Sequence, residues 1–558
     1  MISFLIKEGL IYDGTGSEPF EGDIGIAGET IAFVRRKKGF NKEPDPAEKI
    51  IDARNLAVAP GFIDTHAHSD FTIVADPRAE GKICQGITTE VNGNCGLSGA
   101  PLTGEALERR GEDLRELDVK ERWSNLKEYF EILKKQGIAP NFATLVGHGN
   151  LRACVVGYEN RSPDSGEIAG MKELLREAIS EGAIGLSTGL IYPPGIYSKT
   201  IELIDLCSFM RRIFQSSHPA RGSPLSGEAG KEKLPVKNET GIYASHIRSE
   251  GERLIEALKE ALKIGEESGI NIHISHIKTS GEKNWNKIDS AISIMEQARK
   301  RNVRVTCDRY PYTEASTDLD TVLPPWVFEG GTIKEIERLK NPETRDRIRR
   351  EIRNDSRGKG PWEKIFISTV QSERNRWMEG KKVAEIAHLR DVNPIDLVFD
   401  LLIQERLRVT AIFSSMNEEN LKRLLKLPYV MVGTDSAARC TDGLTCKGRP
   451  HPRGFGSFPR FLGRYVRTEN LMSFSEAIRK ITLLPAETFG IARRGIIQEG
   501  AFADVVVFDH KRVVDEATFE EPFLKPKGIY FVFINGVPVL WEGEMTDNKP
   551  GRILRHGL

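Results

Sequence analysis

Histidine, cysteine and aspartate residues recur at the ends of apolar segments along the middle of the chain. His66 and His68 form the first group, in the segment GFIDTHAHSD. Because side chains alternate along a strand, two histidines two residues apart point the same way and can bind one metal ion. The pair alone does not distinguish a metal site from two incidental surface histidines, so the other segment ends decide the interpretation.

Four more residues of metal-ligand type follow other strand-like segments. Cys95 lies in VNGNCGLSG, just past a strand pattern at 88–91, and His246, His276 and Asp435 end the segments YASH, IHISH and VMVGTD. Imidazole, thiolate and carboxylate are the groups that bind zinc in proteins. Residues of this kind at several different strand ends predict one metal site rather than scattered polar side chains.

The segments that carry these residues alternate with amphipathic helical patterns. Strands are expected at 142–147, 183–187, 241–245, 271–275, 303–307 and 430–434, and helices at 104–117, 123–136, 166–181, 251–267, 286–301 and 381–390. Repeated β/α units of this size predict a TIM barrel over residues 59–490. Active sites of such barrels lie at the C-terminal ends of the strands, where the polar residues fall.

Both ends of the chain are rich in strand patterns. Residues 1–58 contain short apolar runs between turn residues, and 491–558 contain strand patterns at 503–509 and 529–540. Asn535-Gly536 is a hairpin turn signal inside the last of these. We therefore expect an α/β protein, a TIM (β/α)8 barrel with a small β-sandwich formed by both chain termini.

Two stretches interrupt the barrel pattern. Residues 216–240 are rich in glycine, proline, serine and lysine, which predicts a surface insertion. Residues 313–365 follow a strand pattern and contain a highly charged helical pattern near 333–352. This second stretch is too long for an ordinary βα loop, so we expect a lid or a subdomain.

Composition limits the classes of partner and of compartment. The 558 residues include 80 basic and 80 acidic side chains, and this balance argues against nucleic acid or an anionic membrane surface as partner. The seven cysteines are odd in number and form no CxxC pair, so a reduced, cytoplasmic location is expected. No signal peptide or membrane-spanning stretch is predicted. We therefore interpret the protein as cytoplasmic, with neither nucleic acid nor a membrane as partner.

The chain resembles the D-aminoacylases (N-acyl-D-amino-acid deacylases) of the amidohydrolase superfamily. The matching segments span residues 59–509 and are APGFIDTHAHSD, ITTEVNGNCGLSGAPL, GAIGLSTGLIYPPG, YASHIRSEG, HISHIKTSG, CDRYPYTEAST, VGTDSA, HPRGFGSFPR and LLPAETFGIARRGIIQEGAFADVVVFD. The resemblance implies zinc-dependent hydrolysis of the acyl–amide bond of N-acyl-D-amino acids. The insertion at 216–240 departs from the family pattern, which leaves the role of His218 open.

The resemblance also implies how the metal ligands divide. Many barrel amidohydrolases bridge two metals with a carbamylated lysine, but the segment GAIGLSTGLIY contains none. Cys95 instead matches a cysteine that D-aminoacylases use. The implied tight zinc site consists of Cys95, His246 and His276, and a second, weaker site is faced by His66, His68 and Asp435. Whether one zinc ion or two are required stays open.

Two residues are expected to take part in the chemistry itself. Zinc makes hydroxide available near neutral pH and polarises a carbonyl. Asp435 is placed at the last strand to take the proton of the attacking water and pass it to the leaving amine. Tyr192, in LIYPPG, can donate a hydrogen bond to the developing oxyanion, although a packed loop aromatic fits the sequence as well.

The free carboxylate of such a substrate requires cationic donors. Arg453 in HPRGFG and Lys278, two residues past His276, are the expected ones. The resemblance adds Tyr310 and Ser316 in RYPYTEAS as contacts of the same carboxylate. His148 in LVGHGN is interpreted as a structural loop histidine.

A cyclic-amide hydrolase of hydantoinase or dihydroorotase type is the alternative function on this fold. The missing lysine and the presence of Cys95 favour the linear amide. The sequence leaves open whether the preferred side chain is neutral and apolar, D-glutamate or D-aspartate. It also leaves the oligomeric state open.

Overall fold

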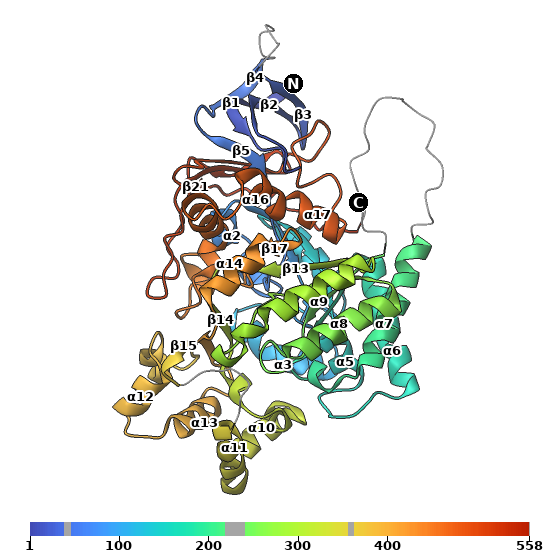
Figure 1. The fold of residues 1–558 in the computed structure, drawn as a ribbon, viewed down its shortest axis with the longest axis vertical. Coiled ribbons are helices and arrows are strands. Elements are labelled where there is room, and N and C mark those ends of the chain that lie inside the picture. Colours follow the sequence, from blue (N-terminus) through green and yellow to red (C-terminus); the bar gives the residue numbers. More distant parts are fainter. Residues whose placement is uncertain (38–45, 218–239, 355–361, 557–558) are drawn as a thin grey trace.

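The computed structural model describes residues 1–37, 46–217, 240–354 and 362–556 (Figure 1). Most of the insertion predicted at 216–240, with His218, therefore lies outside the described residues. Figure 1 shows a β-rich unit at one end, a middle layer of strands surrounded by helices, and a separate group of helices at the opposite end.

The middle layer contains a closed ring of parallel strands. One three-stranded sheet has the order β6-β7-β8, and a six-stranded sheet has the order β17-β13-β12-β11-β10-β9. β8 and β9 are separated only by Leu145, and the ring closes between β6 and β17, where Asp435 N donates to His66 O at 2.7 Å. The ring strands are β6 (Phe62–Asp64), β7 (Ile87–Asn92), β8 (Asn141–Thr144), β9 (Val146–Gly147), β10 (Gly185–Gly189), β11 (Ile242–His246), β12 (Asn271–Ile274), β13 (Val305–Arg309) and β17 (Val430–Val432). This arrangement agrees with the predicted barrel.

Helices surround the ring and bury one apolar face each. In α8, Leu254, Leu258, Ala261 and Leu262 are buried, the three- and four-residue spacing of an amphipathic helix. The helices around the ring are α1 (Thr72–Ala75), α2 (Glu80–Ile83), α3 (Gly104–Glu116), α4 (Leu126–Gln136), α5 (His148–Val155), α6 (Ser165–Glu181), α7 (Thr200–Ser217), α8 (Leu254–Ser268), α9 (Ile288–Lys300), α14 (Glu418–Lys426), α15 (Arg453–Arg460), α16 (Phe474–Ile481) and α17 (Leu483–Phe489).

Strand β11 shows how the fold brings a polar side chain to one end of the barrel. Ile242 and Ala244 belong to a buried apolar cluster. The same cluster contains residues of β6, β7, β8 and β17. Because side chains on a strand alternate between its two faces, His246 shares the face of these two residues and follows them at the C-terminal end. The apolar residues thus fill the barrel, and the histidine emerges at its mouth.

Both chain ends contribute to one nine-stranded sheet, in agreement with the predicted β-unit from the two termini. Its strands are β1 (Ile2–Ile11), β2 (Phe20–Ala27), β3 (Thr30–Arg36), β4 (Ala47–Asp52), β5 (Ala57–Pro60), β18 (Val505–Phe508), β19 (Ile529–Ile534), β20 (Val537–Trp541) and β21 (Glu544–Met545). β5 pairs with β18, which joins the N-terminal strands to the C-terminal ones. Asn535 and Gly536 have φ values of 50° and 77°, as the predicted hairpin turn requires.

Strand β18 also attaches this sheet to the barrel. Val505 and Val507 pack in the core of the sheet. Val506 and Phe508, on the other face, pack in a second cluster that contains Phe62 of β6 and residues of α16. Because side chains alternate along β18, its two faces pack in two different hydrophobic cores.

The group of helices at the far end is an insertion between β13 and α14, and it is longer than predicted. It contains β14 (Glu314–Asp318), β15 (Ile365–Thr369) and β16 (Thr410–Ser414) with α10 (Gly331–Lys340), α11 (Pro342–Asn354), α12 (Val383–Leu389) and α13 (Pro394–Gln404). The strand order is β14-β16-β15, so the central strand comes last in the sequence. The boundary at 365 was therefore wrong, and so was the assignment of the helix at 381–390 to the barrel. Both errors arise because β16 pairs with β14 and β15, contacts between distant segments that the sequence pattern does not reveal.

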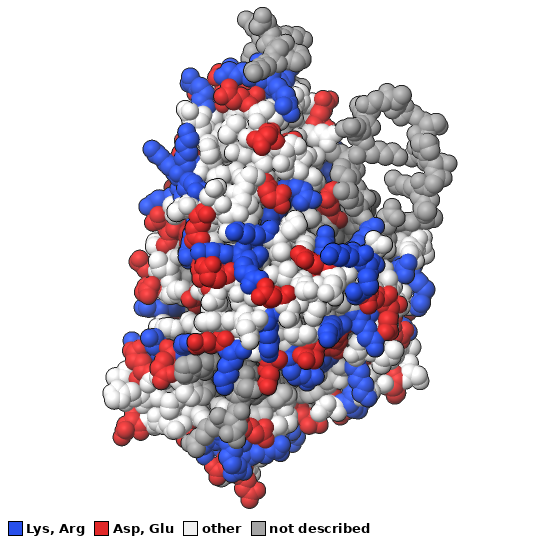
Figure 2. Space-filling view, in the orientation of Figure 1, with Lys and Arg blue, Asp and Glu red and all other residues white. Residues whose placement is uncertain are grey.

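Two surface properties complete the description. Figure 2 shows basic and acidic side chains intermingled over the face in view. Ion pairs of the protein include Arg408 with Glu116 and Arg345 with Asp400. Within the described parts of the chain, no helix combines the length and the apolar character needed to cross a membrane.

A buried lysine lies where the ring of strands closes. Lys82 of α2 has no exposed surface, and its Nζ is 2.7 Å from Asp64 Oδ2 on β6 and 3.0 Å from Glu90 Oε1 on β7. The same ammonium donates to Thr434 Oγ1 and to Ser436 O, both at 2.8 Å, just after β17. One cation therefore links the first, second and last strands of the ring.

We expect Lys82→Met to destabilise the fold by about 3–5 kcal/mol, because it leaves two carboxylates buried without their cation. The free energy of unfolding, measured in denaturant, tests this. Lys134→Met is the control, since the Lys134–Glu131 pair is half exposed and its loss should leave that free energy nearly unchanged. Equal stability of the two variants would contradict the role given to Lys82.

Candidate metal centre and active site

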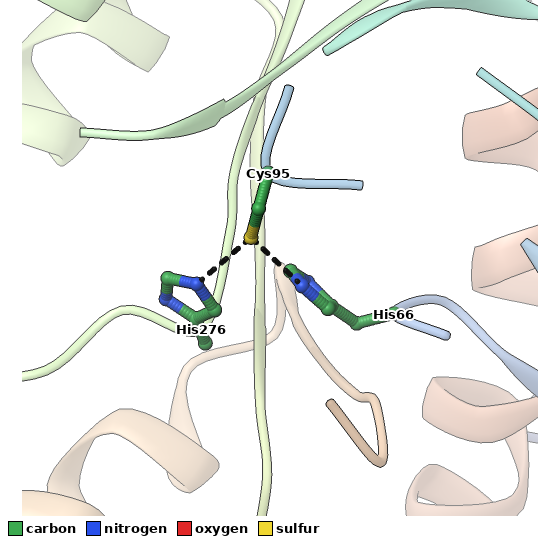
Figure 3. Close-up of side chains that lie close together, drawn as sticks. All are labelled: His66, Cys95 and His276. Atoms are coloured by element: carbon green, nitrogen blue, oxygen red, sulfur yellow. Dashed lines mark hydrogen bonds between the residues drawn. The ribbon is translucent and has the colours of Figure 1, made fainter. Parts of the chain in front are cut away.

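The thiol of Cys95 is surrounded by imidazoles from three strands. Its Sγ lies 3.3 Å from His66 Nε2, 3.3 Å from His276 Nε2 and 3.6 Å from His246 Nδ1. Figure 3 shows the His66 and His276 rings on either side of the sulfur atom. Four ligand-type side chains, far apart in the sequence, thus converge on one point at the mouth of the barrel.

Asp435 and His68 extend this cluster. Asp435 Oδ1 lies 3.2 Å from His68 Nε2 and 3.5 Å from His66 Nε2. His66 therefore contacts both Cys95 and Asp435, and it lies between the two halves of the cluster.

Among the described residues, three sets of side chains have ligand atoms within 4.8 Å of one another. The sets are His66, Cys95 and His276; His66, His68 and Asp435; and His246, Glu250 and His276. All six ligands predicted from the sequence occur in them. The second set matches the predicted weaker site, whereas the first groups Cys95 with His66 and not with His246. The division into a tight and a weak site stays a prediction.

Three of these ligand candidates have an unusual backbone. Cys95, His276 and Asp435 have φ values of 54°, 36° and 51°, in the left-handed region that residues with a Cβ atom rarely adopt. Such conformations persist where the surroundings hold them, and they concentrate at functional sites. Here Asp435 N donates to His66 O, and His276 N donates to Asp308 Oδ1 at 2.6 Å.

Asp308 and Glu250 hold the histidines from behind and were not predicted. Asp308 Oδ2 lies 3.1 Å from His66 Nδ1, and Glu250 Oε1 lies 2.9 Å from His276 Nδ1. In both rings Nε2 faces Cys95, while Nδ1 contacts the carboxylate. The carboxylate therefore orients the ring for a ligand role. A carboxylate within the strand pattern VTCDR, and another four residues after His246, were the available signals.

The cluster changes the protonation of its members. Burial alone raises the pKa of the Cys95 thiol, but the neighbouring His66 and His276 lower it, and the net pKa lies well below the usual value. Cys207 is the contrast, since burial raises its pKa and no cation opposes this. Cys95 is therefore suited to bind a metal as thiolate, and Cys207 is a core residue.

A cavity of about 360 Å³ opens above the cluster, between the barrel mouth and the insertion. Its lining includes His68, Cys95, His246, His276 and Asp435, and from the insertion Phe328 and residues of β14. All of the predicted catalytic and substrate-binding residues also line it, namely Tyr192, Lys278, Tyr310, Ser316, Arg453 and Asp435. The structure thus brings these six side chains to one cavity, although they are spread over about 260 positions of the sequence.

The polar residues of the cavity are held in definite positions. Arg453 Nη1 donates to Asp435 Oδ2 at 2.8 Å, and Arg453 Nη2 donates to the backbone O of Ser316 at 3.2 Å. Lys278 Nζ lies 2.9 Å from His276 Nδ1 and pairs with Glu250.

Two tyrosines face the same space. Tyr192 Oη lies 3.0 Å from Thr317 Oγ1, and burial raises the pKa of Tyr192, which keeps it protonated as a donor. The buried hydroxyl of Tyr310 has no hydrogen-bond partner among the described residues. An unpaired buried hydroxyl costs free energy unless a ligand or water completes it.

His148 lies away from the cavity. Its Nε2 is 2.8 Å from Glu202 Oε1, which also pairs with Arg152, and all three side chains are buried. These contacts favour the structural interpretation.

The chain is similar to known amidohydrolases. The sequence pattern of the amidohydrolase family matches residues 49–200 and 339–540. The chain is 34% identical to a D-aminoacylase of Alcaligenes xylosoxydans xylosoxydans over 552 residues, covering 99% of this chain and 97% of the relative. The chain belongs to the amidohydrolase family.

Solved amidohydrolases share the whole fold. An N-acyl-D-glutamate deacylase of Bordetella bronchiseptica, complexed with zinc and a phosphonate that mimics the tetrahedral intermediate, is 32% identical with a TM-score of 0.79, and the match covers 99% of each chain. A D-aminoacylase structure that addresses a binuclear centre, with one-metal activation and second-metal attenuation, is 31% identical over 100% of each chain with a TM-score of 0.79.

We expect Cys95→Ala to abolish activity and tight zinc binding in this amidohydrolase, because the variant lacks the thiolate that three imidazoles surround. Zinc content of the purified protein, by elemental analysis, is the measurement. Cys207→Ala is the matched control, since that cysteine is equally buried but lies in the helical core, and it should keep its zinc. Retention of zinc by Cys95→Ala would remove Cys95 from the ligands.

Proposed function

We propose that this chain hydrolyses the acyl–amide bond of N-acyl-D-amino acids and releases a carboxylate and a free D-amino acid. One observation carries the proposal: a single cavity joins a cluster of metal ligands to a cationic and hydroxyl-bearing wall. A metal held by the ligand cluster can activate water and a carbonyl, and the cationic wall can hold a carboxylate. This combination fits a linear N-acyl amino acid, whose amide and carboxylate are separated by one carbon atom.

The ligand set fits zinc. Thiolate and imidazole are its preferred protein ligands, and the carboxylates behind the histidines are the usual partners of zinc ligands. We propose a tight site at Cys95, His246 and His276, with His66, His68 and Asp435 toward a second, weaker one. Bound zinc supplies a Lewis acid that activates water near pH 7 and polarises the amide carbonyl. β10 carries no lysine, which disfavours the cyclic-amide alternative.

Asp435 and Tyr192 are the residues proposed to act on the reacting atoms. Asp435 accepts the proton that water loses as its oxygen adds to the acyl carbon. It then delivers that proton to the nitrogen as the C–N bond breaks. Tyr192, a partly buried donor on the cavity wall, donates a hydrogen bond to the carbonyl oxygen as negative charge develops there.

Arg453, Tyr310 and Lys278 are the proposed contacts of the substrate carboxylate. Arg453 uses Nη1 and Nη2 for Asp435 and Ser316, and its remaining N–H groups stay available for an anion. The buried Tyr310 hydroxyl has no hydrogen-bond partner among the described residues, and it can donate to the substrate carboxylate. Lys278 adds a positive charge near the metal ligand His276.

The substrate is a small molecule, and we propose a cytoplasmic location. All seven cysteines are free, and five of them are buried, which is usual for proteins of reducing compartments.

Asp435→Ala is expected to lower kcat by at least roughly 100-fold, because the variant has no group to move the proton between water and the leaving amine. Steady-state kinetics and zinc content of the same sample separate this loss from a loss of metal. Asp205→Ala, an exposed aspartate paired with Lys172, is the control. Unchanged kcat in Asp435→Ala would assign the proton transfer to another group.

Hydrolysis is expected to favour D over L substrates, and Arg453→Ala to raise KM for the D form. With the carbonyl held at the metal and the carboxylate at Arg453, exchanging hydrogen and side chain forces a clash or releases the carboxylate. Losing such a desolvated contact costs about 2–5 kcal/mol, or roughly 30- to several-thousand-fold in kcat/KM. N-acetyl-D- and N-acetyl-L-methionine, assayed with the wild type, Arg453→Ala and the exposed control Arg115→Ala, provide the test. Equal rates on both enantiomers would refute the carboxylate contact.

A further inference from the structure

Arg439 is one of four arginines that line the cavity, and it has no acidic partner among the described residues. Arg439 lies in the loop that follows β17, three residues after Ser436, and it lines the same cavity as Arg453. Its guanidinium makes one long contact, from Nη1 to the backbone O of Thr445 at 3.4 Å. Among the described residues, no carboxylate forms an ion pair with it.

The other cations of the cavity differ from Arg439 in this respect. Lys278 pairs with Glu250, and Arg453 pairs with Asp435. Arg109 and Arg110 lie near Asp318, whose pKa they lower against the larger effect of burial. Each of these charges is therefore opposed by an acidic group on the cavity wall.

The surroundings of Arg439 disfavour its charge. Burial and the like charge of Arg453 lower the pKa of Arg439, Cys446 opposes them, and the net pKa is about 10. A partly buried cation without an anion is disfavoured, and groups with shifted pKa values concentrate at functional sites. An anionic ligand in the cavity relieves this cost, and guanidinium binds carboxylates with two parallel hydrogen bonds.

We infer that Arg439 forms a second anion subsite, which binds a second carboxylate of the substrate. The inference rests on the proposed function, in which the α-carboxylate is held by Arg453 and Tyr310. The second carboxylate can belong to the side chain of an acidic D-amino acid or to the end of a dicarboxylic acyl group. In both cases the substrate has two carboxylates. One is the α-carboxylate, and the other lies on the amino-acid side chain or at the end of the acyl group.

The wild-type zinc enzyme tests the subsite with pairs that differ in one charge. N-acetyl-D-glutamate is compared with N-acetyl-D-glutamine, and N-succinyl-D-methionine with N-pentanoyl-D-methionine. We expect kcat/KM to be higher for the dicarboxylate by at least ~10-fold in one pair, the scale of a charge-assisted hydrogen bond. A preference in the first pair identifies a side-chain carboxylate, and one in the second identifies an acyl carboxylate.

Arg439→Gln then assigns the preference to the residue. The ratio of kcat/KM within the preferred pair should fall by at least ~10-fold. Arg115→Gln is the control, because the side chain of Arg115 is 67% exposed and lies outside the cavity lining. That ratio should be unchanged in the control.

Each outcome decides the inference. A wild type that prefers neither dicarboxylate, while it cleaves N-acetyl-D-methionine, overturns the subsite and leaves the proposed function intact. A preference that Arg439→Gln retains also overturns the subsite. Failure to cleave any N-acyl-D-amino acid overturns the proposed function, and the subsite with it.

Discussion

The ammonium group of Lys82 holds the two strands at which the barrel closes, and the site depends on that closure. Its four partners lie on β6, on β7 and directly after β17. Asp64 repeats the linkage, since it accepts hydrogen bonds from the backbone N of both His66 and Thr434. His66 and Asp435, the candidate ligands from the first and last strands, are therefore positioned by the same buried charges.

Above this closure, the side chains of the site are crowded in a way that fits the proposed ligand role. Cys95 lies between imidazoles, and carboxylates stand behind two of those rings. Three of the residues also have backbone conformations that cost about 1–3 kcal/mol each. This strain positions the candidate metal ligands, and the hydrogen bonds that Asp308 accepts from the His276 backbone and shares with the His66 ring oppose it.

The sequence predicted the ring of strands and its ligands because both follow local rules. A ligand at the end of a strand, such as His246, is visible from alternation alone, and Cys95 is marked by its glycine-flanked loop. Asp308 and Glu250 were missed because their role exists only across strands, where each contacts a histidine from another part of the chain. The end of the insertion was misplaced for a similar reason, since the partners of β16 are not evident from its own residues.

The cavity wall formed by β14 belongs to a body with a core of its own. The apolar residues of the insertion form a cluster separate from that of the barrel, while the candidate metal ligands lie on the barrel side. Substitutions that repack the insertion therefore reshape one wall of the cavity without disturbing the ligand geometry. Such a division lets selectivity diverge among descendants of one gene while the hydrolytic chemistry is inherited unchanged.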